Sequence, residues 1–341
     1  MLSIVTSTAR PDHPMVDYNA FIYEPTIRGL NHQKEDFEWI VVDGCWSEDR
    51  RRYIANRANF PFKYVGAKGS RYLDAGMVAL GGMRNRGIAL AKGDHIMLLD
   101  DCTEPRPGWI KRIEDYWAQG KSAFSLTYYF EGNKPKIIDQ GIRITEELYG
   151  RVIDHQASWE QIIPPGHWVR DSRAKFVDQG LRVPYPEWFY SGCSFPTDLA
   201  WAINGFDEAL DGKKGLEDVD FGYRMHKTGN LHGVLDPELW HIEHRHGPVA
   251  PGLFTYVGPT TVCNYGLMQL SEKEGRLVAN QTIIDRDALE RGRELCKSCN
   301  NYERCKGEEL GGNFYIESPG LETWLKLQKK TTLDMYTTGM V

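Results

Sequence analysis

Short apolar runs alternate with helical patterns along the first 130 residues of the chain. We expect four of these runs to form strands, at residues 2–6, 38–42, 62–65 and 95–99. Apolar residues at near-helical spacing predict a helix over 77–91, and another helix is predicted over 15–23, where Pro25 would end it. Apolar strands separated by helices are typical of a mostly parallel sheet covered on both faces. The pattern therefore predicts an α/β fold.

Polar and acidic residues follow the predicted strands at their carboxyl ends. Thr6 and Ser7 end the first strand, Asp43 ends the second, and Asp100 and Asp101 follow the fourth. Ligands of such sheets bind outside the carboxyl ends of the strands. We therefore expect these side chains to lie on one edge of the sheet, where a nucleotide would bind.

The rest of the chain is organised less regularly. Residues 130–187 are rich in aromatic and basic residues and contain several prolines, and a second ordered block covers 188–246. After a Pro- and Gly-containing stretch the chain becomes polar with a helical pattern. We predict one domain over residues 1–250, with 130–187 as a variable segment, and a small helical C-terminal extension over 251–341.

The net charge and the hydropathy of the chain limit the partners and the location that we expect. The formal net charge is −6, so the field of the whole molecule does not attract nucleic acid, and a nucleic-acid partner is unexpected. No apolar run approaches the roughly 20 residues that span a bilayer. The first residues enter a strand-like segment without a secretory leader. We expect a cytoplasmic protein with no membrane span.

The first chemical motif is the acid pair Asp100-Asp101. Adjacent carboxylates repel each other, so a divalent cation often neutralises them. Mg²⁺ and Mn²⁺ prefer such oxygen ligands and are completed by substrate phosphates. Cys102, which follows the pair, is a poor ligand for Mg²⁺. The alternative interpretation is an acid pair that forms a turn or caps a helix.

The second motif is an acidic helix start, with Glu217, Asp218 and Asp220 in four residues. Carboxylates are favoured electrostatically at a helix N-terminus, and this alone would explain the cluster. A carboxylate there is also suited to act as a general base toward a hydroxyl group.

Histidines and cysteines supply two further candidate metal sites. His241, His244 and His246 lie within six residues, which suggests coordination by neutral imidazole, although a single histidine is more often a hydrogen-bonded polar group. Near the C-terminus the spacing favours a metal over a disulfide, with structural zinc, an iron–sulfur cluster or ordinary thiols as the alternatives. The cysteines of this C-terminal cluster are Cys296, Cys299 and Cys305.

Taken together, these segments resemble the family 2 glycosyltransferases, which have the GT-A fold. The resemblance runs from residue 2 to about 246 and is weakest over 130–187. The matching pieces occur in the family's order, at residues 3–6, 40–44, 84–89, 91–94, 98–101, 205–208, 217–220 and 240–246. The resemblance implies a GT-A-type, mostly parallel sheet between helices, with the variable segment on the acceptor side.

The resemblance also implies how a nucleotide sugar would be held. Asp43 would hydrogen-bond the base of the donor, with uridine expected, beside Thr6 and Ser7. Arg84 lies where the family places a basic residue near the donor, and Asp100 would support the metal site.

The metal, implied by the resemblance to be Mn²⁺ or Mg²⁺, would be bound by Asp101. His244 matches a histidine that completes the metal site in some members, and His241 is a weaker candidate. Many relatives have Asp-X-Asp, whereas the third position here is Cys102.

Catalysis implied by the resemblance is a single displacement that inverts the anomeric centre. Asp218 would be the base that takes the proton of a hydroxyl acceptor, and Glu217 would orient the acceptor or the base. Trp188 and Tyr190, beside the variable segment, are acceptor candidates because sugars stack on aromatic rings; they are equally typical of a core.

Two other functions compete with glycosyl transfer. A metal-dependent nucleotidyltransferase would share the sheet and the acids, but a glycine-rich or basic loop is expected after its first strand. The loop here contains one basic residue and no glycine. A non-catalytic sugar-binding protein on the same fold would need no general base, so the Glu217-Asp218 pair disfavours it.

Overall fold

The computed structural model describes residues 1–10, 19, 22–67, 79–130, 168–170, 173, 177, 189–211, 216–243, 265–280, 291, 294, 295 and 298. Its centre is one nine-stranded sheet in the order β3-β2-β1-β4-β8-β6-β9-β5, with β7 paired to β6. The strands are β1 (Leu2–Thr8), β2 (Phe37–Asp43), β3 (Phe62–Gly66), β4 (His95–Leu98), β5 (Thr103–Pro105), β6 (Ser122–Phe130), β7 (Trp168–Arg170), β8 (Cys193–Pro196) and β9 (Gly233–Glu243).

The N-terminal half of the sheet is parallel. β1 pairs with β2 and β4, and β2 pairs with β3, all in parallel register. All four strands predicted in this half are confirmed. β2 is buried at every position, as expected when helices cover both faces.

The other half makes the sheet mixed. β8 pairs antiparallel with β4 and β6, and β5 pairs antiparallel with β9, while β6 and β9 are parallel. The predicted α/β fold is confirmed, and its parallel pairs are those of the four N-terminal strands together with the β6–β9 pair. Whether a short strand such as β8 runs parallel or antiparallel to its neighbours depends on the end of the sheet from which the chain enters it. An apolar pattern does not contain this information.

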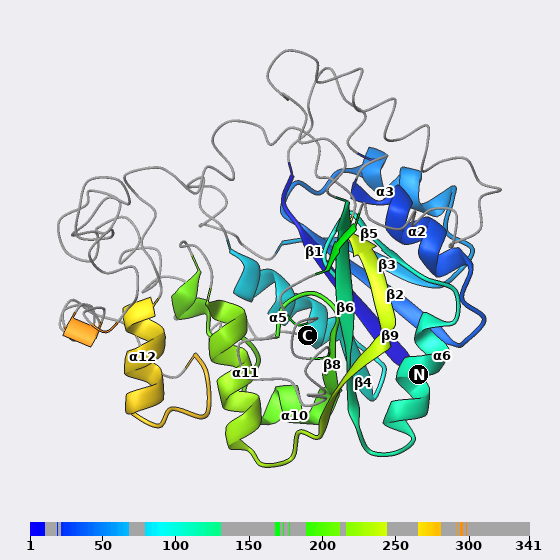
Figure 1. Cartoon of the computed structure of the whole chain (residues 1–341). Helices are drawn as coiled ribbons and strands as arrows, with labels where there is room; N and C mark the ends of the chain where they lie inside the picture. The colour runs from blue at the N-terminus through cyan, green and yellow to red at the C-terminus, as the bar shows by residue number, and fades with distance from the viewer. Residues whose placement is uncertain are drawn as a thin grey trace.

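Helices cover both faces of the sheet (Figure 1). One face carries α2 (Glu24–Asn31), α3 (Glu48–Ala55) and α6 (Trp109–Trp117), whose apolar side chains join one core cluster. The other face carries α5 (Leu80–Leu90), α10 (Thr197–Ala202) and α11 (Glu217–Lys227) over a second cluster, and the 3₁₀ helix η2 (Glu208–Leu210) contacts α5. A Cβ at Gly87 would overlap the side chain of Val5, so this glycine lets α5 lie directly on β1.

Two predicted helices can be compared with the structure. The helix expected over 77–91 is confirmed as α5, whose first predicted residues lie outside the described range. The helix expected over 15–23 lies largely outside the described residues. Ile22 is helical and Tyr23 forms a turn, and Pro25 occupies the first turn of the following helix, α2, where a missing N–H costs nothing.

Part of the predicted C-terminal extension packs on the core. α12 (Tyr265–Lys273) lies against α11, and the backbone of Ala279 donates to Ile203 O at 3.0 Å. Asn280 Nδ2 donates to Phe206 O at 2.9 Å. Within the described part of the chain, no helix is long and apolar enough to cross a membrane.

Candidate active site

Arg84 joins two acidic motifs that are far apart in the sequence. Its Nη1 donates to Glu217 Oε1 at 3.0 Å, and its Nη2 lies 3.9 Å from Asp100 Oδ1. Burial alone would lower the pKa of Arg84, but the surrounding carboxylates raise it. The guanidinium therefore stays charged and holds the end of β4 beside the start of α11.

Asp218 lies in the first turn of α11, next to this pair. Burial and the neighbouring Glu217 carboxylate raise the pKa of Asp218 to about 6. The helix begins after Leu216, which adopts a left-handed conformation with φ of 71°. A carboxylate with a pKa near 6 is ionised at neutral pH and is more basic than an exposed aspartate, which suits a general base.

The two acids that follow β4 differ in their surroundings. Asp101 is buried, and its Oδ2 accepts hydrogen bonds from Thr8 Oγ1 and Arg10 Nε, both at 2.6 Å. Arg10 Nη2 donates to Oδ1 at 3.0 Å, which completes a bidentate pair. The side chain of Asp100 is 45% exposed. Asp100, and not Asp101, is thus the more accessible acid.

Cys102 is turned away from this edge. Its backbone has a positive φ of 60°, and its N–H donates to Ile22 O at 3.1 Å. The thiol is buried, and burial together with Asp101 raises its pKa well above the usual value. The third position of the acid motif therefore contributes an interior thiol and no ligand.

Metal binding at this edge depends on which carboxylates are accessible. Among the described residues, no group of three or more His, Cys, Asp or Glu side chains is arranged to hold a metal ion. Asp101 as placed does not fit a metal, since Arg10 and Thr8 already engage its carboxylate. Asp100 fits, because Mg²⁺ and Mn²⁺ in such sites need only one or two carboxylates plus substrate phosphates. His244 lies outside the described residues.

His241 is placed in the interior and not at the metal edge. It lies in β9, is fully buried, and its Nδ1 is 2.9 Å from Ser125 Oγ. Its Nε2 is 3.1 Å from Thr127 Oγ1 and 3.4 Å from Ser191 Oγ. Both ring nitrogens therefore contact hydroxyl groups, which corrects the expectation of a metal ligand at this position.

Asp43 is also more enclosed than expected. It is fully buried, and its Oδ2 accepts from Tyr23 Oη at 2.5 Å, Tyr64 Oη at 2.6 Å and Arg50 Nη1 at 2.8 Å. Its Oδ1 accepts from the Cys45 N–H at 2.7 Å. Burial and the Asp43 charge raise the pKa of Tyr23 well above its usual value. As placed, the carboxylate organises this end of the sheet without being exposed at its edge.

Thr6 and Ser7, in the second half of β1, have different surroundings. Thr6 is buried, and its Oγ1 accepts from Trp39 Nε1 at 3.0 Å, so it contacts the core and not the edge. Ser7 as a residue is half-buried, but its Oγ is itself buried and has no hydrogen-bond partner among the described residues.

The candidate acceptor side is described only in part. Tyr190 is half-buried, and the guanidinium of Arg173 lies 4.1 Å above its ring centroid. Trp188 lies outside the described residues, as do the cysteines of the C-terminal cluster. Those cysteines are Cys296, Cys299 and Cys305.

Several residues of this edge were not predicted. Arg10 and Thr8 hold Asp101, and Arg50 links Asp43 to the backbone carbonyl of Arg10 at 2.6 Å. In the sequence, Thr8 and Arg10 were marked only by their place in the loop after the first predicted strand. The partners of a buried carboxylate come from distant segments, which spacing does not reveal.

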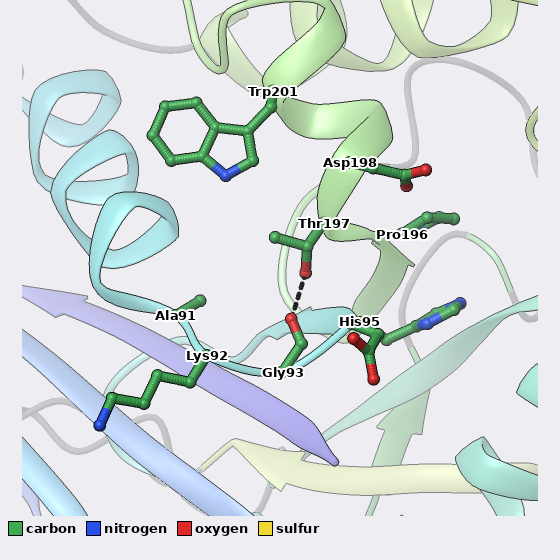
Figure 2. Close-up of a pocket in the computed structure, with 9 residues that line it drawn as sticks. Ala91, Lys92, Gly93, His95, Pro196, Thr197, Asp198 and Trp201 are labelled. Carbon is green, nitrogen blue, oxygen red and sulfur yellow. Dashed lines mark hydrogen bonds between the residues drawn. The ribbon is translucent and has the colours of Figure 1, made fainter.

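An open pocket of about 590 Å³ lies at the opposite edge of the sheet (Figure 2). His95, which lines it, begins β4, whereas Asp100 follows the other end of that strand. Thr197 Oγ1 donates to Gly93 O at 2.6 Å between two residues that line the pocket, and Trp201, which also lines it, is exposed. This pocket is therefore separate from the acidic edge.

Comparison with known proteins confirms the fold. Residues 22–171 match the model of the family described as glycosyl transferase family 2. TarS 1-349 of S. aureus in complex with UDP aligns with a TM-score of 0.52 and 12% identity, over 90% of this chain and 76% of that chain. Its complex with UDP-GlcNAc aligns with a TM-score of 0.53 and 11% identity, over 98% and 80%. No curated protein matches the sequence. The predicted GT-A fold and the resemblance to family 2 glycosyltransferases are confirmed.

Proposed function

We propose that the chain transfers a sugar from a nucleotide-diphosphate donor, with UDP as the nucleotide, to a hydroxyl acceptor, and that the anomeric centre is inverted. The observation that carries this proposal is the Arg84 bridge, which brings Asp100 and the Glu217-Asp218 pair to one edge. The family match over residues 22–171 supports glycosyl transfer. Structures of the same fold that contain UDP or UDP-GlcNAc support a uridine donor.

Asp218 is the proposed base. Its pKa of about 6 leaves it ionised at pH 7 yet able to accept the proton of the acceptor hydroxyl as the oxygen attacks. Glu217 is fixed by Arg84 at 3.0 Å and is proposed to orient the base or the acceptor. A base on the face opposite the leaving group gives inversion in one displacement, by the geometry that also separates inverting from retaining glycosidases.

The departing diphosphate requires positive charge. Arg84 supplies a permanent cation beside Asp100, which is the proposed carboxylate ligand for Mn²⁺ or Mg²⁺. Such a metal, when bound, stabilises the leaving group by its charge. Asp101 would take part in metal binding only if Arg10 released it, and His244 stays a predicted ligand.

The nucleotide end of the site is built around buried charges. Asp43 holds Tyr64, on which the half-exposed ring of Trp46 stacks with centroids 6.3 Å apart. We assign Asp43 to organising the base site, and Ser7, whose hydroxyl has no partner among the described residues, to contact with the nucleotide.

The remaining assignments stay predictions. Tyr190, and Trp188 beside it in sequence, are proposed acceptor contacts. Structural zinc at the C-terminal cysteine cluster and a cytoplasmic location also remain predictions from the sequence.

Two measurements test the proposal. A thermal-shift screen of nucleotide sugars with and without Mn²⁺ should show stabilisation by a UDP-sugar, since a donor that binds the native state raises its melting temperature. Product analysis should then show release of UDP. Release of pyrophosphate from UTP and a sugar phosphate would instead indicate a nucleotidyltransferase. Donor binding with neither product would indicate a sugar-binding protein.

A further inference from the structure

We propose that His241 is a positioning residue that holds the Asp100 end of β4 through the hydroxyl of Ser191. This inference rests on the proposed function, because it gives His241 a role in placing the carboxylate that would bind the metal. It assigns to the buried histidine a task other than metal coordination.

The contacts form a continuous path between the two residues. His241 Nε2 lies 3.4 Å from Ser191 Oγ, and the backbone N–H of Asp100 donates to the same Oγ at 3.0 Å. Asp100 lies beyond Leu98, the last residue of β4, with Leu99 between them, so this bond holds the acid just past the end of that strand. The imidazole is therefore one hydroxyl away from the backbone of the acid.

A fixed donor lies at each end of this path, since the Asp100 N–H donates to Ser191 Oγ and an indole N–H donates to Ser125 Oγ. Trp109 Nε1 donates to Ser125 Oγ at 2.8 Å, and an indole N–H can only donate. Ser125 can then donate its own proton to His241 Nδ1, 2.9 Å away. The proton of a neutral imidazole is then on Nε2, which faces Thr127 and Ser191; in the other tautomer Nδ1 donates to Ser125 and Nε2 accepts. Either neutral tautomer therefore keeps the imidazole in contact with Ser125 on one side and Ser191 on the other.

The backbone around Ser191 is shaped to the imidazole ring. Gly192 has a φ of 81°, and a Cβ at this position would lie 2.7 Å from His241 Cε1. Its N–H donates to Leu98 O at 2.8 Å, and its carbonyl accepts from the Ser125 N–H at 2.7 Å. The Ser191-Gly192 peptide is therefore packed on the ring and bonded to both β4 and β6.

Loss of the path through Ser191 should affect the position of Asp100 more than the packing of the core. Asp100 is partly exposed, and its carboxylate lies 3.9 Å from Arg84, so small backbone movements change its distance from a metal or a diphosphate. Loss of the Ser191 link should therefore weaken metal binding. Loss of the Ser125 link should affect mainly packing.

A pair of substitutions separates the two links. In His241→Gln the side-chain amide reaches the position of Nε2 and keeps the contact with Ser191. In His241→Asn it reaches the position of Nδ1 and keeps the contact with Ser125. Mn²⁺ binding to the full chain is measured by electron paramagnetic resonance with saturating UDP, and UDP release is measured as a function of Mn²⁺ concentration.

We expect His241→Asn to weaken Mn²⁺ binding about three- to tenfold, the effect of one lost hydrogen bond. His241→Gln should stay within about twofold of wild type, and the melting temperatures of the two variants should be similar. Ser191→Ala should weaken Mn²⁺ binding as much as His241→Asn, and the double variant should be no worse than either single one.

Equal Mn²⁺ affinity in the Asn and Gln variants would overturn the role of His241. Full additivity of Ser191→Ala and His241→Asn would overturn it as well, and this comparison still decides the matter if the Gln variant does not fold. A wild-type chain that binds neither Mn²⁺ nor UDP and releases no UDP would overturn the proposed function itself, which is a distinguishable result.

Discussion

Glu217 Oε1 accepts a hydrogen bond from Arg84 Nη1 at 3.0 Å, with both side chains almost completely buried. The helix that carries the arginine covers the parallel half of the sheet, and the glutamate begins α11. This ion pair links two segments that are far apart in the sequence. It also places a fixed cation between the acid that follows β4 and the proposed base.

Breaking this ion pair should cost both stability and activity. Arg84→Gln leaves the Glu217 carboxylate buried without its cation, so we expect the free energy of unfolding to fall by about 3–5 kcal/mol. Turnover should fall at least about tenfold, because the donor diphosphate loses a neighbouring charge. Urea denaturation and UDP release measure the two effects.

Arg86→Gln is the matched control for this change. Arg86 lies on the same helix but is only half-buried, so its loss should alter stability by no more than about 0.5 kcal/mol. Equal losses in the two variants would mean that the pair with Glu217 has no special role.

The pH dependence of the reaction should report the proposed base. Burial and Glu217 raise the pKa of Asp218 to about 6, and only the ionised form can accept a proton. We therefore expect kcat/KM to rise between about pH 5 and 7 and to level off above, with an apparent pKa near 6. A rate that is constant across this range would exclude Asp218 as the group that must be ionised.

The Arg10–Asp101 pair should control metal binding in the absence of donor. Arg10→Gln removes the cation from a buried carboxylate, so we expect lower thermal stability. The freed negative charge should strengthen Mn²⁺ binding about tenfold, as expected when a nearby positive charge is lost. Asp101→Asn in the Arg10→Gln background should remove this gain. Unchanged Mn²⁺ affinity in Arg10→Gln would show that Asp101 stays unavailable whether or not Arg10 is present.

The close contact of α5 with β1 predicts a simple packing effect. Gly87→Ala places a methyl group against Val5, so we expect a destabilisation of about 1–3 kcal/mol from overpacking. Ala89→Ser, on the half-exposed side of the same helix, should remain near wild type in urea denaturation. A Gly87→Ala variant as stable as wild type would show that the two elements can separate without cost.

The sequence predicted those features that depend on local pattern. The apolar runs identified β1 to β4, and the carboxyl-end rule placed Asp100 at the active edge. The acidic start of α11 was recognised because three carboxylates in four residues favour a helix N-terminus. Each of these signals is contained in a few neighbouring residues.

The partners of the acids could not be predicted in this way. Asp101 and Asp43 carry the carboxylates that the pattern assigned to ligands, yet Arg10, Tyr23 and Arg50 engage them. The fold brings these partner side chains to the carboxylates, and they determine which carboxylate oxygens remain accessible to a ligand. The burial of His241 could not be predicted either, because it depends on the pairing of β6 with β9.

The most direct test of the site compares wild type with Asp218→Asn for UDP-sugar turnover in Mn²⁺ and, separately, for donor binding. We predict that wild type releases UDP in an acceptor-dependent reaction, and that the variant loses about 10²–10⁴-fold in turnover, the range of a positioned base. Its donor-induced thermal shift should be retained. Turnover of Asp218→Asn equal to that of wild type would contradict the assignment of this edge as the site of transfer.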